Sequence, residues 1–147
     1  MTRAAHIRND ESHSPFRFPV RVYYEDTDAA GIVYYANYLR FMERARTEWL
    51  AAIGCTLDEL AREHHGMFVV HRVEVDFRNP ARLGDLLAVS VEPRERRGAR
   101  LVATQRVTRD EEPIADAQVT LALLDCRNGR PIRLPPSLAA RMEVPKP

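Results

Sequence analysis

Cysteine is scarce in this chain. Cys55 and Cys126 are the only two among 147 residues, and they stand far apart, outside any paired-cysteine motif. This spacing argues against a structural zinc site and against a redox-active disulfide. Neither cysteine has a histidine beside it in the sequence, which also disfavours a cysteine nucleophile. We therefore expect both thiols to be reduced and structural.

An excess of one charge and long hydrophobic runs are missing too. The chain has 22 basic and 21 acidic residues, so nothing global attracts it to nucleic acid or to an anionic membrane. No segment approaches the ~20 consecutive apolar residues that span a bilayer, and residues 1–15 lack the apolar stretch of a signal peptide. We expect one cytoplasmic domain without a transmembrane segment.

The hydrophobic pattern of the first half predicts a strand followed by a long helix. Apolar and polar side chains alternate over residues 17–24, as in a half-buried strand. Over residues 38–53 an amphipathic helix is predicted, with Asn37 as its N-cap and Gly54 as its C-terminal stop. A short second helix is expected at 57–63. The apolar face of the long helix is expected to contain Tyr38, Leu39, Met42, Ala45, Trp49, Leu50 and Ile53.

The second half predicts four consecutive strands. They are expected at residues 69–77, 86–91, 100–108 and 114–124, with hairpin turns at 94–99 and 109–113. Four antiparallel strands would leave one apolar face bare, and the long helix is the only long amphipathic element that could cover it. The fold class is therefore α+β, with a sheet wrapped around one helix.

One continuous motif joins the first strand to the long helix. It reads YEDTDAAGIVYYANY over residues 24–38 and, with the element order, resembles the 4-hydroxybenzoyl-CoA thioesterase family. The segments FMERARTE at 41–48 and PARLGD at 80–85 are most similar to the Tol-Pal-associated acyl-CoA thioesterases within that family.

The resemblance implies a hotdog domain at residues 16–137, in which about five antiparallel strands wrap around one central helix. Residues 1–15 would be a flexible N-terminal arm and 138–147 a C-terminal tail. The implied activity is that of an acyl-CoA thioesterase, which hydrolyses the thioester to a free acid and coenzyme A. No metal and no cofactor are expected, since coenzyme A is part of the substrate.

Asp28 is the candidate catalytic residue. In the family that the motif resembles, the second aspartate of the Asp-x-Asp pair is the catalytic carboxylate, and it corresponds to Asp28. Tyr35 is the second catalytic candidate, at a position where many Tol-Pal-associated members have histidine and the aromatic-substrate enzyme has tyrosine. Acyl chain length and aromatic preference stay open. Asp26 is expected to turn away from Asp28 or to cap a turn.

The residues that follow Asp28 suit thioester hydrolysis. The reaction needs a carboxylate at the carbonyl carbon and donors for the oxygen that becomes negative. Gly31 lets the backbone approach a ligand closely, and the N-terminus of a helix offers unpaired N–H groups. We expect backbone N–H groups near Val33 to Tyr35 to form the oxyanion hole, with Tyr38 in the acyl pocket. Asp28 could act as nucleophile or as general base.

Two structural interpretations compete for the acidic motif. Residues 25–28 are also typical of a solvated acidic turn. A calcium loop is the second alternative, because Asp26, Asp28 and Gly31 match the first, third and sixth positions of an EF-hand. Ala30 and Asn37 stand where that loop needs acidic ligands, so the calcium interpretation fails.

Glu43 is an internal rival to Asp28. Glu43 and Thr47 lie one helical turn apart on one face, and a second subtype of 4-hydroxybenzoyl-CoA thioesterase uses a helix carboxylate with a nearby threonine. The simpler interpretation of Glu43 is an ion pair with a neighbouring arginine of the helix, which the sequence favours.

Arg97 is the candidate for binding the phosphates of coenzyme A. It stands in a predicted hairpin turn that is rich in arginine, whose charges suit phosphate groups. The resemblance assigns nucleotide binding to this region, while an ordinary solvated turn explains the charges equally well. The four arginines concerned are Arg94, Arg96, Arg97 and Arg100.

The fold that the resemblance implies also occurs in proteins with other functions. An acyl-thioester dehydratase of the same fold would need a histidine near the central helix, and none occurs between Glu25 and Ile53. A non-catalytic acyl-thioester-binding or scaffold protein of a cell-envelope complex is the alternative, since fold alone does not fix function. One hotdog leaves sheet edges open, so we expect a homodimer or homotetramer. An acyl carrier protein is a further candidate substrate.

Overall fold

The computed structural model describes residues 15–145, so nearly all of the predicted N-terminal arm lies outside it. None of the described helices is long and apolar enough to cross a membrane. The elements in chain order are β1 (Phe16–Arg21), the 3-10 turn η1 (Tyr24–Asp26), α2 (Asn37–Ala52), α3 (Leu57–His64), β2 (Gly66–Phe77), β3 (Leu86–Arg97), β4 (Arg100–Arg109), β5 (Glu112–Asp125) and α4 (Pro136–Ala139).

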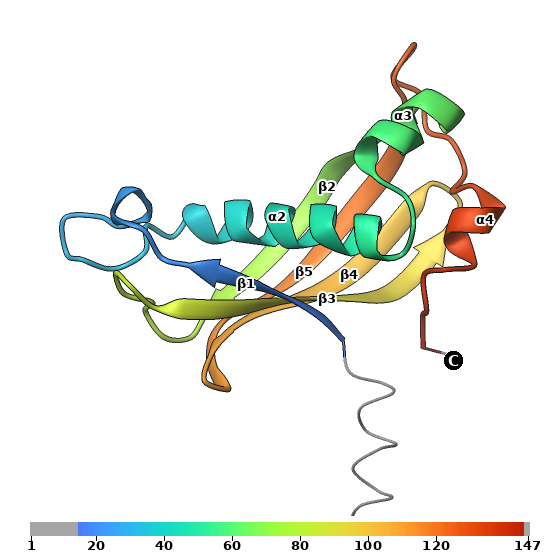
Figure 1. Cartoon of the computed structure of the whole chain (residues 1–147). Helices are drawn as coiled ribbons and strands as arrows, with labels where there is room; N and C mark the ends of the chain where they lie inside the picture. Colours follow the sequence, from blue (N-terminus) through green and yellow to red (C-terminus); the bar gives the residue numbers. More distant parts are fainter. Residues whose placement is uncertain (1–14, 146–147) are drawn as a thin grey trace, which may run out of the picture.

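The strands form one antiparallel sheet of five, in the order β1-β3-β4-β5-β2. β1 and β2 are therefore the two edges of the sheet. Figure 1 shows α2 lying along one face of this curved sheet, with the segment before α2 at one end of the molecule. The predicted α+β architecture, a sheet wrapped around one long helix, is confirmed.

The buried residues of α2 recur every three or four positions, as expected for an amphipathic helix that packs on a sheet. Leu39 was predicted on this face, but it is 42% exposed because it lies beside the stripe that contains Tyr38 and Met42. Phe41, which the prediction omitted, is fully buried. The buried residues of the helix are Tyr38, Phe41, Met42, Ala45, Trp49 and Leu50.

A buried polar side chain fixes α2 to the middle of the sheet. Gln105 of β4 is completely buried, and its Nε2 donates to the Met42 carbonyl (3.0 Å) and the Ser90 carbonyl (3.3 Å). Its Oε1 accepts a hydrogen bond from Arg46 (2.9 Å). Burial lowers the pKa of the Arg46 guanidinium. Because buried polar groups are costly unless paired, this network specifies one rotation of α2.

Both predicted hairpin turns are shorter than expected. The arginine-rich turn predicted at 94–99 contains only residues 98–99, because β3 and β4 extend into it. Gly98 has φ +60°, a conformation that glycine adopts without strain in a tight connection. The turn predicted at 109–113 shrinks to residues 110–111, which both have positive φ.

The predicted helix at 38–53 agrees with α2 within one residue at each end, but its N-cap was predicted wrongly. Ala36 is the N-cap, and Asn37 is the first helical residue. The Asn37 side chain instead donates to the Asp26 carbonyl (2.9 Å), a tertiary contact that local sequence does not reveal. Gly54 follows the helix with φ +96°, as predicted for its stop.

Leu60→Ala is expected to lower the free energy of unfolding by about 2–5 kcal/mol. Leu60 is fully buried where α3 meets β2, and a Cβ added at Gly66 would lie 3.3 Å from its Cγ. Truncation therefore leaves a cavity. Leu57→Ala in the same helix is the matched control, because Leu57 is 46% exposed and should cost less than about 0.5 kcal/mol. Equal losses of unfolding free energy in the two variants, measured by chemical denaturation, would contradict this packing.

Candidate active site at the N-terminus of the long helix

Asp26 holds the motif together from inside. Its side chain is 6% exposed, and its Oδ2 accepts the Tyr23 N–H (2.8 Å) across the 3-10 turn η1. This turn also ends β1 at Arg21, three residues earlier than predicted. The Asp26 carbonyl accepts the N–H of Tyr34 (3.0 Å) and the Asn37 side chain (2.9 Å). The expectation that Asp26 caps a turn is confirmed.

Asp28 lies at the tip of a tight loop and is exposed. Its Oδ1 accepts the Ala30 N–H (2.8 Å), and its Oδ2 accepts no hydrogen bond from a described residue. Backbone bonds close the loop, from the Asp28 N–H to the Ile32 carbonyl (2.9 Å) and from the Gly31 N–H to the Asp28 carbonyl (3.0 Å). Gly31 has φ +79°, where other residues are strained. The loop thus presents one free carboxylate oxygen to solvent.

The candidate oxyanion donors are the backbone N–H groups at the start of α2. The Val33 N–H already donates to the Ala81 carbonyl (2.9 Å), and the Tyr34 N–H to the Asp26 carbonyl (3.0 Å). The N–H groups of Tyr35 and Ala36 have no acceptor within residues 15–145. They lie at the positive end of the helix dipole, where a developing negative charge is stabilised.

An aromatic pocket adjoins these donors. It has a volume of about 240 Å³ and is lined by Ile32, Val33, Tyr35, Tyr38, Phe77, Arg78, Asn79 and Pro80. The Phe77 ring packs edge-on against Tyr35 (6.0 Å between centroids) and lies 5.8 Å from Tyr38. Sequence reasoning treated Phe77 as an ordinary strand residue. The signal for its role is its position as the last residue of β2, where that strand reaches the N-terminal end of α2.

Tyr38 connects the pocket to the β2–β3 loop (residues 78–85). The Tyr38 side chain is 4% exposed, and its hydroxyl oxygen accepts the Ala81 N–H (3.1 Å). Burial raises the pKa of Tyr38, and the hydrogen bond from Ala81 opposes this shift only in part. The ring therefore lines the pocket, while its hydroxyl is engaged in holding the β2–β3 loop.

Glu43 and Thr47 lie together on the flank of α2 that faces β2. Both line a cavity of about 170 Å³, and Glu43 also lines a neighbouring one of about 250 Å³. The Thr47 hydroxyl donates to the Glu43 carbonyl (3.1 Å). No arginine of the described chain forms an ion pair with Glu43 within 4 Å, so the expected pair is not formed.

Arg97 lies far from Asp28 within one chain. The carbonyl of Asp85, just before β3, accepts the N–H of Val22, whereas Arg97 is the last residue of β3. A strand of this length extends over roughly 35 Å. Figure 1 shows the β3–β4 hairpin at the end of the molecule opposite the segment before α2.

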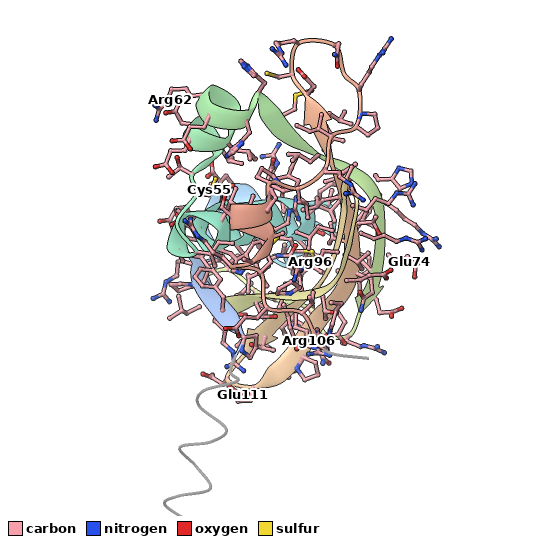
Figure 2. All side chains as sticks on the ribbon, turned by 90° about the vertical axis from the view of Figure 1, so that its right-hand side faces the viewer. Cys55, Arg62, Glu74, Arg96, Arg106 and Glu111 are labelled. Atoms are coloured by element: carbon pink, nitrogen blue, oxygen red, sulfur yellow. The ribbon has the colours of Figure 1, made fainter. Side chains whose placement is uncertain are left out.

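The hairpin end has a basic cavity of its own. Arg96, Arg97 and Arg133 contribute to the lining of a space of about 310 Å³ between the hairpin and α4. Figure 2 faces this end and shows Arg96 on it. Arg94, by contrast, pairs with Glu92 (3.3 Å). Sequence reasoning missed Arg133 because it stands in the proline-rich segment after the last strand.

The two cysteines differ in burial. Cys55 is buried, and burial raises the pKa of its thiol, whereas Cys126 is exposed. Within residues 15–145, no group of three His, Cys, Asp or Glu side chains is arranged to hold a metal ion.

Several known proteins are similar to this chain in sequence or in structure. Residues 22–142 match the family model of the Thioesterase-like superfamily. Acyl-CoA thioesterase YbgC of Haemophilus influenzae is 43% identical over 125 residues, which are 85% of this chain and 92% of that protein. A probable thioesterase from Bartonella henselae has a similar structure, with a TM-score of 0.80 at 36% identity over 83% of this chain and all of that one.

A solved thioesterase structure with a bound ligand is similar as well. It is a thioesterase from Thermus thermophilus in complex with coenzyme A and zinc, with a TM-score of 0.74 and 34% identity. The match covers 86% of this chain and 90% of that one.

Tyr38→Phe is expected to lower the free energy of unfolding by about 1–3 kcal/mol, because it leaves the buried Ala81 N–H without an acceptor. Tyr34→Phe is the matched control: Tyr34 is 47% exposed, so its hydroxyl should contribute less than about 0.5 kcal/mol. Chemical denaturation of both variants measures the difference. A Tyr38→Phe variant as stable as the control would show that this hydrogen bond does not hold the loop.

Proposed function

Since the chain belongs to the thioesterase-like superfamily and is an acyl-CoA thioesterase, we propose that it hydrolyses its substrate at Asp28. The observation that carries this proposal is the free Oδ2 of Asp28 on a loop that leads directly to the unpaired N–H groups of Tyr35 and Ala36. A carboxylate and a pair of aimed donors are what thioester hydrolysis requires. The other aspartate of the motif is not free, since Asp26 is buried and bonded.

The proposed reaction uses both groups together. The thioester carbonyl oxygen accepts hydrogen bonds from the N–H groups of Tyr35 and Ala36, which stabilise the charge that develops on it. Asp28 either attacks the carbonyl carbon, expelling coenzyme A thiolate and leaving an anhydride that water opens, or takes a proton from the water that attacks. Either route yields the free acid and coenzyme A.

The aromatic pocket is the proposed site for the start of the acyl group. Tyr35 and Phe77 are 61% and 52% exposed, so their rings offer apolar surface that a bound acyl group would cover. Tyr38 completes this surface from inside. In this assignment Tyr35 acts through its N–H on the carbonyl oxygen and through its ring on the acyl group, while Gly31 and Val33 shape the loop that presents Asp28.

A homodimer is proposed because the residues assigned to the substrate do not meet in one chain. β2 is an edge strand, and Met67, Val70 and Phe77 on it are 40%, 51% and 52% exposed. Exposed apolar edges favour pairing with another strand. Antiparallel pairing of two β2 strands would place the Gly66 end of one beside the Phe77 end of the other.

This dimer would also give Arg97 a role. The Gly66 end of β2 pairs with Asp125, and Arg100 pairs with Ala122 nearby on the same strand, so the basic hairpin lies at that end. The arginines of one copy would therefore approach the site of the other, where the phosphates of coenzyme A extend from the thioester. We propose that Arg97, with Arg96 and Arg133, binds these phosphates across the dimer.

The proposed cellular setting is the cytoplasm, where acyl-CoA is available, near the Tol-Pal complex. The basic hairpin end would equally suit the acidic surface of an acyl carrier protein, whose acyl-phosphopantetheine has the same thioester chemistry. A thiol-release assay that compares acyl-CoA with acyl carrier protein across chain lengths distinguishes the two donors.

Asp28→Asn is expected to lower kcat by about 10²–10⁴-fold, because asparagine keeps the acceptor for the Ala30 N–H but has no charge. Glu43→Gln, which removes the rival carboxylate, is expected to leave kcat within about twofold. Release of free thiol from acyl-CoA measures both. Loss of turnover in Glu43→Gln with full activity in Asp28→Asn would place the reaction on the flank of α2 instead.

Val70→Glu is expected to convert the dimer to monomers, since it places a charge in the apolar edge that would be buried. The rate of thiol release should fall when the dimer dissociates, although Asp28 is unchanged. Leu86→Glu, at a residue 51% exposed on β3, is the control for oligomeric state and should remain dimeric. Light scattering measures both; a wild-type protein that is monomeric and fully active would contradict the shared site.

A further inference from the structure

The β2–β3 loop pairs with the loop that carries Asp28. The Val33 N–H donates to the Ala81 carbonyl (2.9 Å), and the Leu83 N–H donates to the Gly31 carbonyl (3.5 Å). Ile32 and Arg82 form an isolated antiparallel bridge between the same two segments. The positions of Asp28 and of the free N–H groups at the start of α2 therefore depend on where the β2–β3 loop lies.

Arg109, at the end of β4, holds both ends of the β2–β3 loop. Its Nη1 donates to the Pro80 carbonyl (3.2 Å) near the start of the loop and to Asp85 Oδ2 (2.5 Å) at its end. The same Asp85 oxygen accepts the Arg82 N–H (2.8 Å) within the loop. Both bonds come from one nitrogen, so a single terminal NH2 group of the guanidinium links the two ends of the loop.

The ion pair between Arg109 and Asp85 is well shielded for a surface feature. Each side chain is 23% exposed, whereas Glu112, which accepts a bond from the other terminal nitrogen of Arg109, is 48% exposed. Burial alone would raise the pKa of Asp85, but the Arg82 N–H and the Arg109 guanidinium outweigh it and hold that pKa below its usual value. The Asp85 carboxylate is therefore held in its charged form, facing the Arg109 guanidinium.

Neither residue reaches the aromatic pocket, whose lining is supplied by residues of the motif and by residues 77–80. Their connection to it runs through Ala81, which is fully buried and bonded to both Val33 and Tyr38. A displaced β2–β3 loop would shift the donors relative to the carbonyl oxygen, and a misplacement of ~1 Å can cost about 10²-fold in rate.

We propose that Arg109 and Asp85, acting through the β2–β3 loop, are positioning residues that hold Asp28 and the Tyr35 and Ala36 N–H groups in register for the reaction assigned above to Asp28. Because they touch no substrate atom, they affect kcat and leave KM nearly unchanged. The acid side of the pH profile should carry their signature. Since the pKa of Asp85 is lowered in the folded protein, the contact is present above the ordinary aspartate pKa and is lost as pH falls through the lowered value.

The test compares Arg109→Met with Arg109→Lys and Glu112→Gln. Arg109→Met is expected to lower kcat by about tenfold or more with KM within about twofold, and Arg109→Lys should recover part of kcat through the ion pair alone. Glu112→Gln loses a partner of Arg109 that lies outside the β2–β3 loop, so its kcat should equal that of the wild type. Amide hydrogen exchange over residues 26–36 should quicken in Arg109→Met and stay unchanged in Glu112→Gln.

Wild-type kcat in Arg109→Met, or a loss of kcat with unchanged exchange over residues 26–36, would overturn the positioning role. A fall in kcat in Glu112→Gln equal to that in Arg109→Met would overturn the positioning role too. The loss would then follow from any change in this turn. Asp28→Asn is assayed in parallel. If it stays active while Arg109→Met exchanges faster, the coupling of the two loops stands and the placement of the reaction at Asp28 fails.

Discussion

The hydrogen bond from the Val33 N–H to the Ala81 carbonyl (2.9 Å) is the contact on which the candidate site depends. It joins two segments that are far apart in sequence, and it turns the Val33 N–H away from any ligand. The Tyr34 N–H is turned inward in the same way by the Asp26 carbonyl. What remains free is the start of α2, where the helix dipole favours an anion. The candidate oxyanion donors are thus the N–H groups that the fold does not already use.

The same framework is the reason for proposing a site shared between two copies of the chain. β3 begins beside the motif and ends at the basic hairpin, so the carboxylate and the arginines lie at opposite ends of the sheet. The exposed apolar edge of β2 offers a way to bring them together, since antiparallel pairing of two copies exchanges the ends. The buried Gln105 network fixes the rotation of α2 and hence the direction of its N-terminal N–H groups.

Sequence periodicity predicted the central helix, the five strands and the α+β class correctly, because the spacing of apolar residues reflects burial on one side of each element. The hotdog fold came from the resemblance of the motif to a known family. The motif identified a thioesterase, and the relatives confirm that activity. Local patterns failed where tertiary contacts decide. Asn37 has the chemistry of an N-cap but bonds to Asp26, and the arginines predicted in a turn continue a strand because their backbones pair across the hairpin.

The pairing of residues 31–33 with residues 81–83 could not be predicted from the sequence either, since it joins two loops that have no periodic pattern. A structure of the Asp28→Asn variant with a non-hydrolysable acyl-CoA analogue tests the account most directly. The predicted result is a carbonyl oxygen within hydrogen-bond distance of the Tyr35 and Ala36 N–H groups, with residue 28 facing the carbonyl carbon. A carbonyl bound instead between Glu43 and Thr47, with those N–H groups facing water, would contradict it.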